Sequence, residues 1–155
     1  MNLCQKTRAL CALLLCALLL SACGQDAAPA DTASNLTCTL SISCTAVLDQ
    51  LPPEKAGLLP EDGWILPATT VSFTEGETAF DLLQRFCREQ EIHLEFDQAP
   101  GMDSAYIQGI GNLYEFDCGD RSGWTYYLNG ESPNYGCSEA VLQDGDTVAW
   151  EYLIF

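Results

Sequence analysis

Residues 117–136 read DCGDRSGWTYYLNGESPNYG, and this stretch joins a cysteine, an alternating aromatic run and a tight turn. Trp124, Tyr126 and Leu128 recur with a period of two, which is typical of a half-buried β-strand. Asn129-Gly130 follows at once and is the dipeptide best suited to a type I′ turn. The stretch therefore predicts an aromatic β-hairpin around which the rest of the chain is organised.

Outside this stretch, the sequence predicts one long helix and several short strands. Residues 38–44 alternate apolar and polar side chains, so we expect them to form a first strand with one buried face. Thr78 is expected to cap a helix whose apolar stripe runs from Phe80 to Cys87. Pro67 restricts the apolar run before it to an edge strand or an extended segment. A helical turn is expected at 52–55, and further strands at 71–73, 92–96, 106–110, 113–116 and 147–155.

These elements define the expected fold class. One helix laid across about five strands, with the first and last strands as neighbours, predicts an α+β fold. We expect a β-grasp-like roll in which the helix packs on a mixed sheet that includes the hairpin. Residues 37–155 are long enough for a single hydrophobic core that buries roughly two-thirds of the unfolded surface.

The N-terminus has the pattern of a bacterial lipoprotein signal. Lys6 and Arg8 precede an apolar run at 9–20 that is too short to span a bilayer, and Leu20-Ser21-Ala22-Cys23 resembles a lipobox. Cys23 is then the lipidated residue, and two or more fatty-acyl chains on it anchor a protein stably. An ordinary signal peptide cleaved nearby is the alternative. The predicted division is a signal peptide, a lipidated cysteine with its flexible tether, and one domain: 1–22, 23–36 and 37–155.

Charge excludes one class of partner. After cleavage at Cys23, four basic residues face 22 acidic ones, which gives a net charge of −18. A surface of that charge repels phosphate backbones, so nucleic acid is not expected to bind. The expected location is the extracytoplasmic face of a bacterial membrane, where the lipid anchor holds the domain.

Five cysteines remain after the signal is removed and Cys23 is lipidated, and an oxidising compartment favours their pairing. Cys118 and Cys137 flank the predicted hairpin, so we expect a disulfide between them. Cys44 ends the buried face of the first strand, and Cys87 is the one cysteine on the helix that covers this face, so they form the second expected pair. Spacing alone leaves the connectivity open.

Catalytic and metal-binding interpretations find little support in the residue patterns. His93 lies between carboxylates on the outer face of a strand without triad-like partners, and Cys87 belongs to an apolar helix face. No CxxC pair indicates zinc, and the turn aspartates lack the spacing of an EF-hand: Asp117, Asp120, Asp144 and Asp146. The sequence therefore predicts no enzyme, no metal and no cofactor.

Several motifs together resemble a known family. Their order matches the bacterial transcobalamin-like C-terminal domain family, also called domain of unknown function 4430: VSF at 71–73, EGETAFDLL at 75–83, YIQGI at 106–110, SGWTY at 122–126, NG at 129–130 and DGDTVAW at 144–150. The resemblance implies a small β-rich binding domain related to the β-domain of vertebrate cobalamin carriers, whose helical barrel domain this chain lacks. Some relatives carry one more cysteine after the last strand, which implies that Cys38 is unpaired here.

The hairpin is the expected recognition surface. Trp124 and Tyr126 are expected to face inward, whereas Tyr127 and Tyr135 are expected at the surface, with Asn129 at the tip. These five residues are the candidate ligand-binding set. The first hypothesis is capture of a cobalamin-like corrinoid or another bulky small ligand. The alternative is a protein- or glycan-contacting surface module without a small-molecule ligand.

Overall fold

A computed structural model describes residues 36–155 of the chain. The predicted signal peptide, the predicted lipidation site at Cys23 and the expected tether up to residue 35 lie outside the described residues. The first strand begins at Leu36, one residue inside the expected tether. None of the helices in the described part of the chain is long and apolar enough to cross a membrane.

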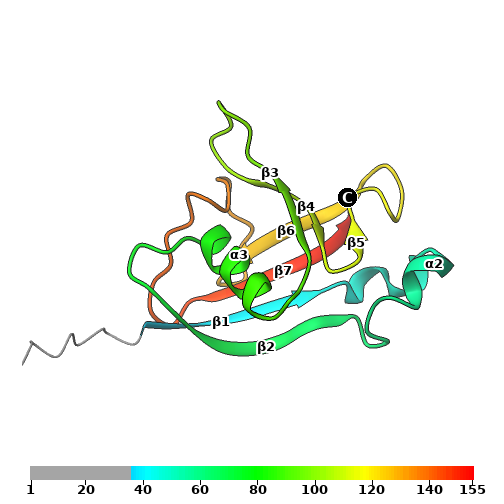
Figure 1. Cartoon of the computed structure of the whole chain (residues 1–155), viewed down its shortest axis with the longest axis horizontal. Helices are drawn as coiled ribbons and strands as arrows, with labels where there is room; N and C mark the ends of the chain where they lie inside the picture. Colours follow the sequence, from blue (N-terminus) through cyan, green and yellow to red (C-terminus); the bar gives the residue numbers. More distant parts are fainter. Residues whose placement is uncertain (1–35) are drawn as a thin grey trace, which may run out of the picture. The chain divides into compact units, whose positions relative to one another are not determined.

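The first sheet contains the two ends of the domain. Its order is β2-β1-β7-β6, where β1 is Leu36–Ser43, β2 Trp64–Phe73, β6 Ser122–Leu128 and β7 Thr147–Ile154 (Figure 1). The central strands β1 and β7 are parallel, and the two outer pairs are antiparallel. The expectation that the first and last strands are neighbours is therefore confirmed.

The edge strand β2 contains Pro67 and is longer than predicted. Leu40 pairs with Thr69 but Ile42 pairs with Leu66, so the register shifts where Pro67 lies. A proline is tolerated on an edge strand at a bulge, because a ladder N–H is dispensable there. The segments expected separately at 64–66 and 71–73 consequently form one strand.

The remaining strands form a second, antiparallel sheet instead of joining the first. Its order is β3-β4-β5, where β3 is Leu94–Asp97, β4 Tyr106–Ile110 and β5 Leu113–Tyr114. The strand β5 is shorter than the expected run to residue 116, because Phe116 adopts a left-handed conformation with φ of 68°. The α+β class is confirmed, and the strands divide between two sheets.

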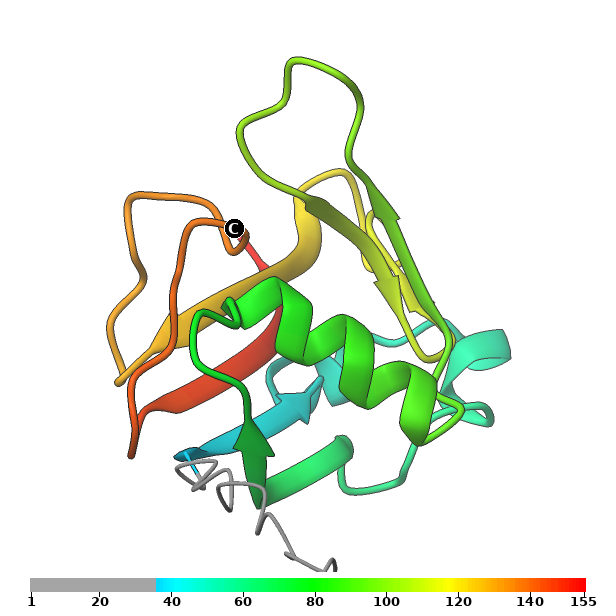
Figure 2. The same cartoon turned by 60° about the vertical axis from the view of Figure 1, so that its left-hand side comes forward.

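The helix α3, Ala79–Glu89, covers the inner face of the first sheet, as Figure 2 shows. Thr78 caps it as predicted: the Thr78 hydroxyl accepts from the Asp81 N–H at 3.1 Å, and the Asp81 carboxylate accepts from the Thr78 N–H at 3.0 Å. The apolar stripe from Phe80 to Cys87 is buried. Two shorter helical elements follow β1, the 3₁₀ helix η1 at Thr45–Gln50 and α2 at Pro53–Ala56, which confirms the expected turn near residue 53.

Two buried side chains connect the sheets. Trp124 on β6 donates its indole N–H to the carbonyl oxygen of Leu113 at 3.0 Å, and the Tyr152 hydroxyl on β7 donates to the carbonyl oxygen of Tyr114 at 2.7 Å. The rings of Trp124 and Tyr152 also contact each other edge to face, with centroids 5.4 Å apart. The second sheet is thus held against the first at β5.

The predicted hairpin exists only as its turn. Asn129 and Gly130 have φ values of 54° and 81°, as a type I′ turn requires, and Leu128 and Glu131 exchange two backbone hydrogen bonds. Beyond Glu131, however, the described chain forms no strand until Thr147, and β6 pairs along its length with β7. Residues 132–136 are poorly suited to pair with β6, because Pro133 lacks a backbone N–H and the segment does not alternate apolar and polar residues. The strand β7 does alternate, and it is the partner of β6.

Candidate functional site

A hollow of about 150 Å³ opens between the start of β4 and the inner face of β6. We call it the aromatic groove. Its lining residues are Ala105, Tyr106, Ile107, Trp124, Thr125, Tyr126, Gly136, Cys137 and Trp150. They come from β4, β6, β7 and the loop after the type I′ turn, so chain segments far apart in the sequence build one surface.

The period of two in β6 and β7 explains why the aromatic residues gather. Trp124 is paired across the strands with Tyr152, and Tyr126 with Trp150. Residues two apart on a strand share a face, so all four rings lie on the inner face of the first sheet. The rings of Tyr126 and Trp150 are 5.4 Å apart at a tilt of 32°. The floor of the groove is therefore a packed aromatic layer.

One donor in this layer has no partner. Among the buried side-chain nitrogen and oxygen atoms of residues 36–155, only Trp150 Nε1 makes no hydrogen bond. The Trp150 side chain is 2% exposed, and leaving a buried donor unsatisfied costs about 1 to 3 kcal/mol. By contrast, the indole N–H of Trp124 is bonded to the Leu113 carbonyl. Trp150, which lines the groove, thus has a buried indole N–H without a hydrogen-bond partner.

Two loops close one wall of the groove through a reciprocal contact, which we call the latch. The Ala105 N–H donates to the Ser138 hydroxyl at 3.1 Å, and the Ser138 N–H donates to the Ser104 hydroxyl at 3.0 Å. The Cys137 thiol adds a hydrogen bond to the Ala105 carbonyl at 3.4 Å. A Cβ on Gly136 would overlap the Ser104 side chain, so only glycine permits this approach.

Two tyrosines at the groove have engaged hydroxyls. Tyr126 donates to the carbonyl oxygen of Tyr135 at 2.9 Å, and burial, with smaller contributions from neighbouring charges, raises the pKa of Tyr126 to about 12. Tyr106 donates to the Glu115 carboxylate at 2.5 Å, and this hydrogen bond is the main cause that raises the pKa of Tyr106 to about 12. Both hydroxyls are therefore neutral at physiological pH, and they fix the positions of the rings.

The structure separates the five residues of the predicted ligand-binding set. Trp124 and Tyr126 line the groove, and Tyr135 lies beside it with 43% of its surface exposed. Tyr127 follows Tyr126 on β6, so its side chain is on the opposite face of the sheet. The side-chain amide of Asn129 has its hydrogen bonds within the protein: its nitrogen donates to the Asp146 carboxylate, and its oxygen accepts from the Thr147 N–H.

Sequence reasoning did not select the other two aromatic residues that line the groove, Tyr106 and Trp150. Trp150 belongs to the strand expected at 147–155, but the sequence pattern did not show that this strand is adjacent to β6. Tyr106 begins a strand of the other sheet, and it meets β6 only through tertiary packing. No local signal in the sequence brings these two residues to the groove.

All five cysteines in the described residues are free thiols, so neither expected disulfide, Cys118–Cys137 or Cys44–Cys87, is formed in the structure. Cys118 lies at the turn before β6, where its N–H donates to the Ser122 hydroxyl. Cys137 instead lines the aromatic groove and contacts Ala105. Cys38 is a buried residue of β1.

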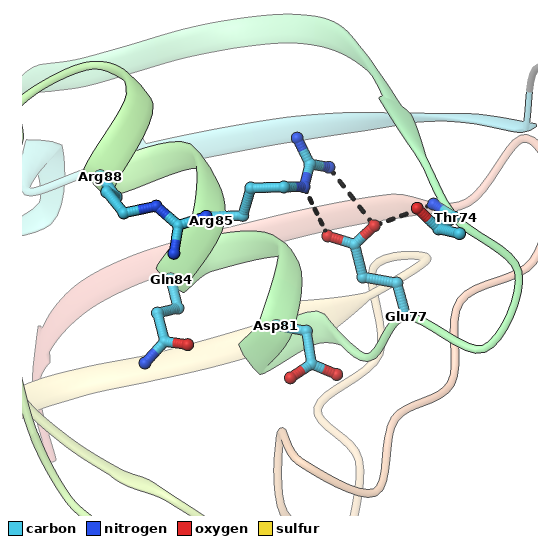
Figure 3. Close-up of a pocket in the computed structure, with 6 residues that line it drawn as sticks. All are labelled: Thr74, Glu77, Asp81, Gln84, Arg85 and Arg88. Atoms are coloured by element: carbon cyan, nitrogen blue, oxygen red, sulfur yellow. Dashed lines mark hydrogen bonds and ion pairs between the residues drawn. The ribbon is translucent and has the colours of Figure 1, made fainter.

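A second hollow, of about 310 Å³, lies beside the first turns of α3 and is polar (Figure 3). Two of its charged groups pair with each other: Arg85 Nε is 2.8 Å from a Glu77 oxygen, and the other Glu77 oxygen accepts from the Thr74 N–H at 2.9 Å. Arg85 also donates to the Ser72 carbonyl at 2.8 Å. This hollow presents no unpaired donor comparable to the one in the aromatic groove.

The described residues offer no arrangement for metal binding or thiol catalysis. Residues 36–155 contain no cluster of three histidine, cysteine or acidic side chains that could hold a metal ion. Burial raises the pKa of the Cys87 thiol to about 12 and also raises that of Cys137, so the nucleophilic thiolate is disfavoured at both. His93 is an exposed residue whose imidazole is 3.8 Å from Glu95.

Comparison with known structures shows where this fold occurs. Haptocorrin, solved in complex with Cbi, matches with a TM-score of 0.53 and 14% sequence identity. The match covers 78% of this chain and 26% of the haptocorrin chain, and it shows a shared fold. A protein from Ruminococcus gnavus, provisionally assigned to metal binding, matches with a TM-score of 0.45 and 12% identity over 77% of this chain and 98% of its own. No curated protein matches the chain.

The family expected from the sequence motifs is confirmed. Residues 76–153 match the model of one family, and this segment is more than half of the chain. It includes α3, the strand β6, all but the last residue of β7, and the whole second sheet. The chain therefore belongs to the family described as Domain of unknown function (DUF4430).

Proposed function

We propose that this domain is a binding module that holds a bulky, amphipathic ligand of the corrinoid class at the aromatic groove. One observation carries the proposal: a groove with an aromatic floor is lined by Trp150, whose Nε1 is the single unpaired buried side-chain donor of the described residues. Ligand sites are typically apolar concavities with a few well-placed polar groups. The fold shared with haptocorrin and the resemblance of the sequence motifs support a corrinoid over other bulky ligands.

The size of the groove determines how much of a ligand it can hold. At about 150 Å³ it is smaller than the ~300 to 1,000 Å³ of pockets that enclose a whole drug-sized ligand. It therefore receives one edge or one amide-bearing arm, whose carbonyl oxygen accepts from Trp150 Nε1. Tyr106 and Tyr135, 46% and 43% exposed beside the groove, provide flat apolar area for the rest of that edge. Contact on one side predicts a dissociation constant in the micromolar range or weaker.

Titration with cobalamin and with cobinamide tests the proposal. We expect saturable quenching of tryptophan emission after inner-filter correction, together with a calorimetric signal. Trp150→Phe keeps an aromatic ring but removes the N–H together with the five-membered ring of the indole, so it should weaken binding about tenfold. Tyr106→Ala should weaken binding by a similar factor, whereas Tyr127→Ala, on the opposite face of the sheet, is the matched control and should not. If neither ligand gives quenching or heat, the corrinoid proposal is wrong.

A second candidate function is contact with a protein or a glycan, and exposed apolar and aromatic side chains favour it. Met102 on the loop before β4 is 41% exposed, and Tyr106 and Tyr135 are exposed as well. Aromatic residues and methionine are enriched at protein interfaces. A glycan array and a binding assay on host-surface proteins distinguish this function. If the domain contacts a protein or a glycan, these assays should show binding by the wild type that is lost in Met102→Ser and in Tyr135→Ala. Titration with corrinoids should then give no signal.

We also propose that Cys23 anchors the protein by lipid to the extracytoplasmic face of a bacterial membrane. The support is the lipobox pattern ending at Cys23 and the basic and apolar segments before it. Cys23→Ser should move the protein from the membrane fraction to the soluble fraction. Metabolic labelling with a fatty acid should mark the wild type and not the variant, and an unlabelled wild type would contradict the anchor.

A further inference from the structure

A third hollow, of about 300 Å³, lies between the segment that joins α2 to β2, the end of α3 and the turn that joins β4 to β5. We call it the leucine hollow. Its apolar lining residues are Leu58, Leu59, Pro60, Ile65 and Ile92. Leu58 is 57% exposed, and Ile65 and Ile92 are half-buried. An apolar group that enters the hollow therefore gains free energy by removing this aliphatic surface from water.

The polar part of the lining carries negative charge. It consists of Glu91, His93, Asn112 and the backbone of Gly111, and it includes no lysine or arginine. Lys55 approaches the same turn, but its ammonium group donates to the Asn112 carbonyl at 3.0 Å and is 2.8 Å from an Asp117 oxygen. The charge of Lys55 is therefore already paired. The Glu91 carboxylate, by contrast, makes no hydrogen bond or ion pair with the described residues.

Glu91 occupies a backbone position at which glycine is usual. It follows the C-cap Gln90 of α3 and has φ of 56°, and the N–H of the next residue, Ile92, donates to the Cys87 carbonyl at 2.8 Å. These features define a Schellman motif, whose left-handed position disfavours any residue with a Cβ. A glutamate held there at a cost in stability, beside a hollow that it lines, indicates a role in binding.

The segments around the leucine hollow are tied to one another. The Gly111 N–H donates to the His93 carbonyl at 2.7 Å, which joins the turn between β4 and β5 to the residues before β3. The side-chain amide of Asn112 donates to the Leu58 carbonyl at 3.4 Å, which joins the same turn to the segment after α2. The hollow is therefore formed before any ligand arrives, as is usual for small-molecule sites.

We propose that the leucine hollow binds a small aliphatic amine. The ammonium group pairs with the Glu91 carboxylate, and the alkyl chain lies against Leu58, Ile65 and Ile92. The chain has 22 acidic and six basic residues, so its field attracts cations and repels anions. The volume of about 300 Å³ is at the lower end of ligand pockets, which indicates a small ligand.

This site is independent of the aromatic groove. The two hollows share no lining residue, so the amine proposal does not depend on the corrinoid proposal. Tyr106→Ala, which should weaken corrinoid binding, should leave amine binding unchanged.

A nuclear magnetic resonance titration of the isotope-labelled full chain with hexylamine tests the proposal. About 150 mM salt screens non-specific attraction to the acidic surface. We expect saturable shifts confined to the amides of residues 58–59, 65, 91–93 and 111–112, with a dissociation constant in the millimolar range. Hexanol has the same alkyl chain without the charge and should bind about tenfold more weakly. Hexanoate should cause no shifts, because its charge has the wrong sign.

Two matched variants assign the charge. Glu91→Gln keeps the length of the side chain and removes its charge, so it should weaken hexylamine binding about tenfold and leave hexanol binding unchanged. Glu131→Gln makes the same change at an exposed glutamate in the turn after β6, and it should bind hexylamine as the wild type does. Equal affinities of the wild type and Glu91→Gln for hexylamine would overturn the proposal.

Glu91→Gly separates binding from stability. Glycine relieves the left-handed strain, so the thermal midpoint should rise by roughly 3 °C, while hexylamine binding should weaken at least tenfold. A higher midpoint with unchanged hexylamine binding would show that Glu91 has no part in a site. Shifts that never saturate, shifts spread over the acidic surface, or equal affinities for hexanol and hexylamine would also contradict the proposal.

Discussion

Replacing Trp124 tests whether one side chain holds the two sheets together. Its indole is buried, donates to the Leu113 carbonyl at 3.0 Å and packs edge to face on Tyr152 at 5.4 Å. Truncating a buried tryptophan to alanine costs about 3 to 5 kcal/mol. The Leu113 carbonyl, on a residue that is 0% exposed, then loses its donor, which adds about 1 kcal/mol. We expect Trp124→Ala to lower the free energy of unfolding by about 4 to 6 kcal/mol.

A series of variants separates the contributions. Trp124→Phe keeps an aromatic ring beside Tyr152 but removes the N–H, so it should cost about 2 kcal/mol and remain folded if the alanine variant does not. Tyr127→Ala, on the opposite face of the same strand, should cost about 1 kcal/mol or less. Guanidinium unfolding at pH 7, followed by far-ultraviolet circular dichroism, gives each value. A Trp124→Ala cost below about 2 kcal/mol, or equal costs for Trp124→Phe and Tyr127→Ala, would refute the bridging role.

Three further perturbations probe the cap, the latch and the pH dependence. Thr78→Ala should cost about 1 kcal/mol in chemical unfolding, and its effect should not be additive with that of Asp81→Ala, because the two residues cap the helix reciprocally. Gly136→Ala should cost about 1 to 3 kcal/mol, because its Cβ would overlap Ser104 and part the two loops; an unchanged midpoint would show that the loops shift freely. The raised pKa of Tyr126, about 12, means that the folded state favours the protonated phenol, so its contribution to stability is complete below pH 10 and is lost as the pH rises towards 12. The denaturant midpoint should therefore fall between pH 10 and 12, less steeply in Tyr126→Phe, and equal slopes for both proteins would contradict the assignment.

The sequence by itself determined the features that depend on neighbouring residues. The reciprocal cap at Thr78, the apolar stripe of α3 and the type I′ turn at Asn129-Gly130 are local, because each is decided within a few residues along the chain. Alternation likewise determined which face of β1, β6 and β7 is buried. Two groove residues, Trp124 and Tyr126, were selected on this basis.

Only the tertiary structure decided which strands meet. A period of two specifies the face that a strand buries but not its partner. The strand β6 was therefore expected to form a hairpin with the residues after the turn, up to 136, although it pairs with β7. The division into two sheets, the approach of Tyr106 to Trp150 across the groove and the latch between Ser104 and Ser138 depend on this pairing. Tyr106 and Trp150, which line one groove, and Ser104 and Ser138, which form the latch, are more than 30 positions apart in the sequence, so their meeting depends on how the whole core packs, which no local pattern encodes.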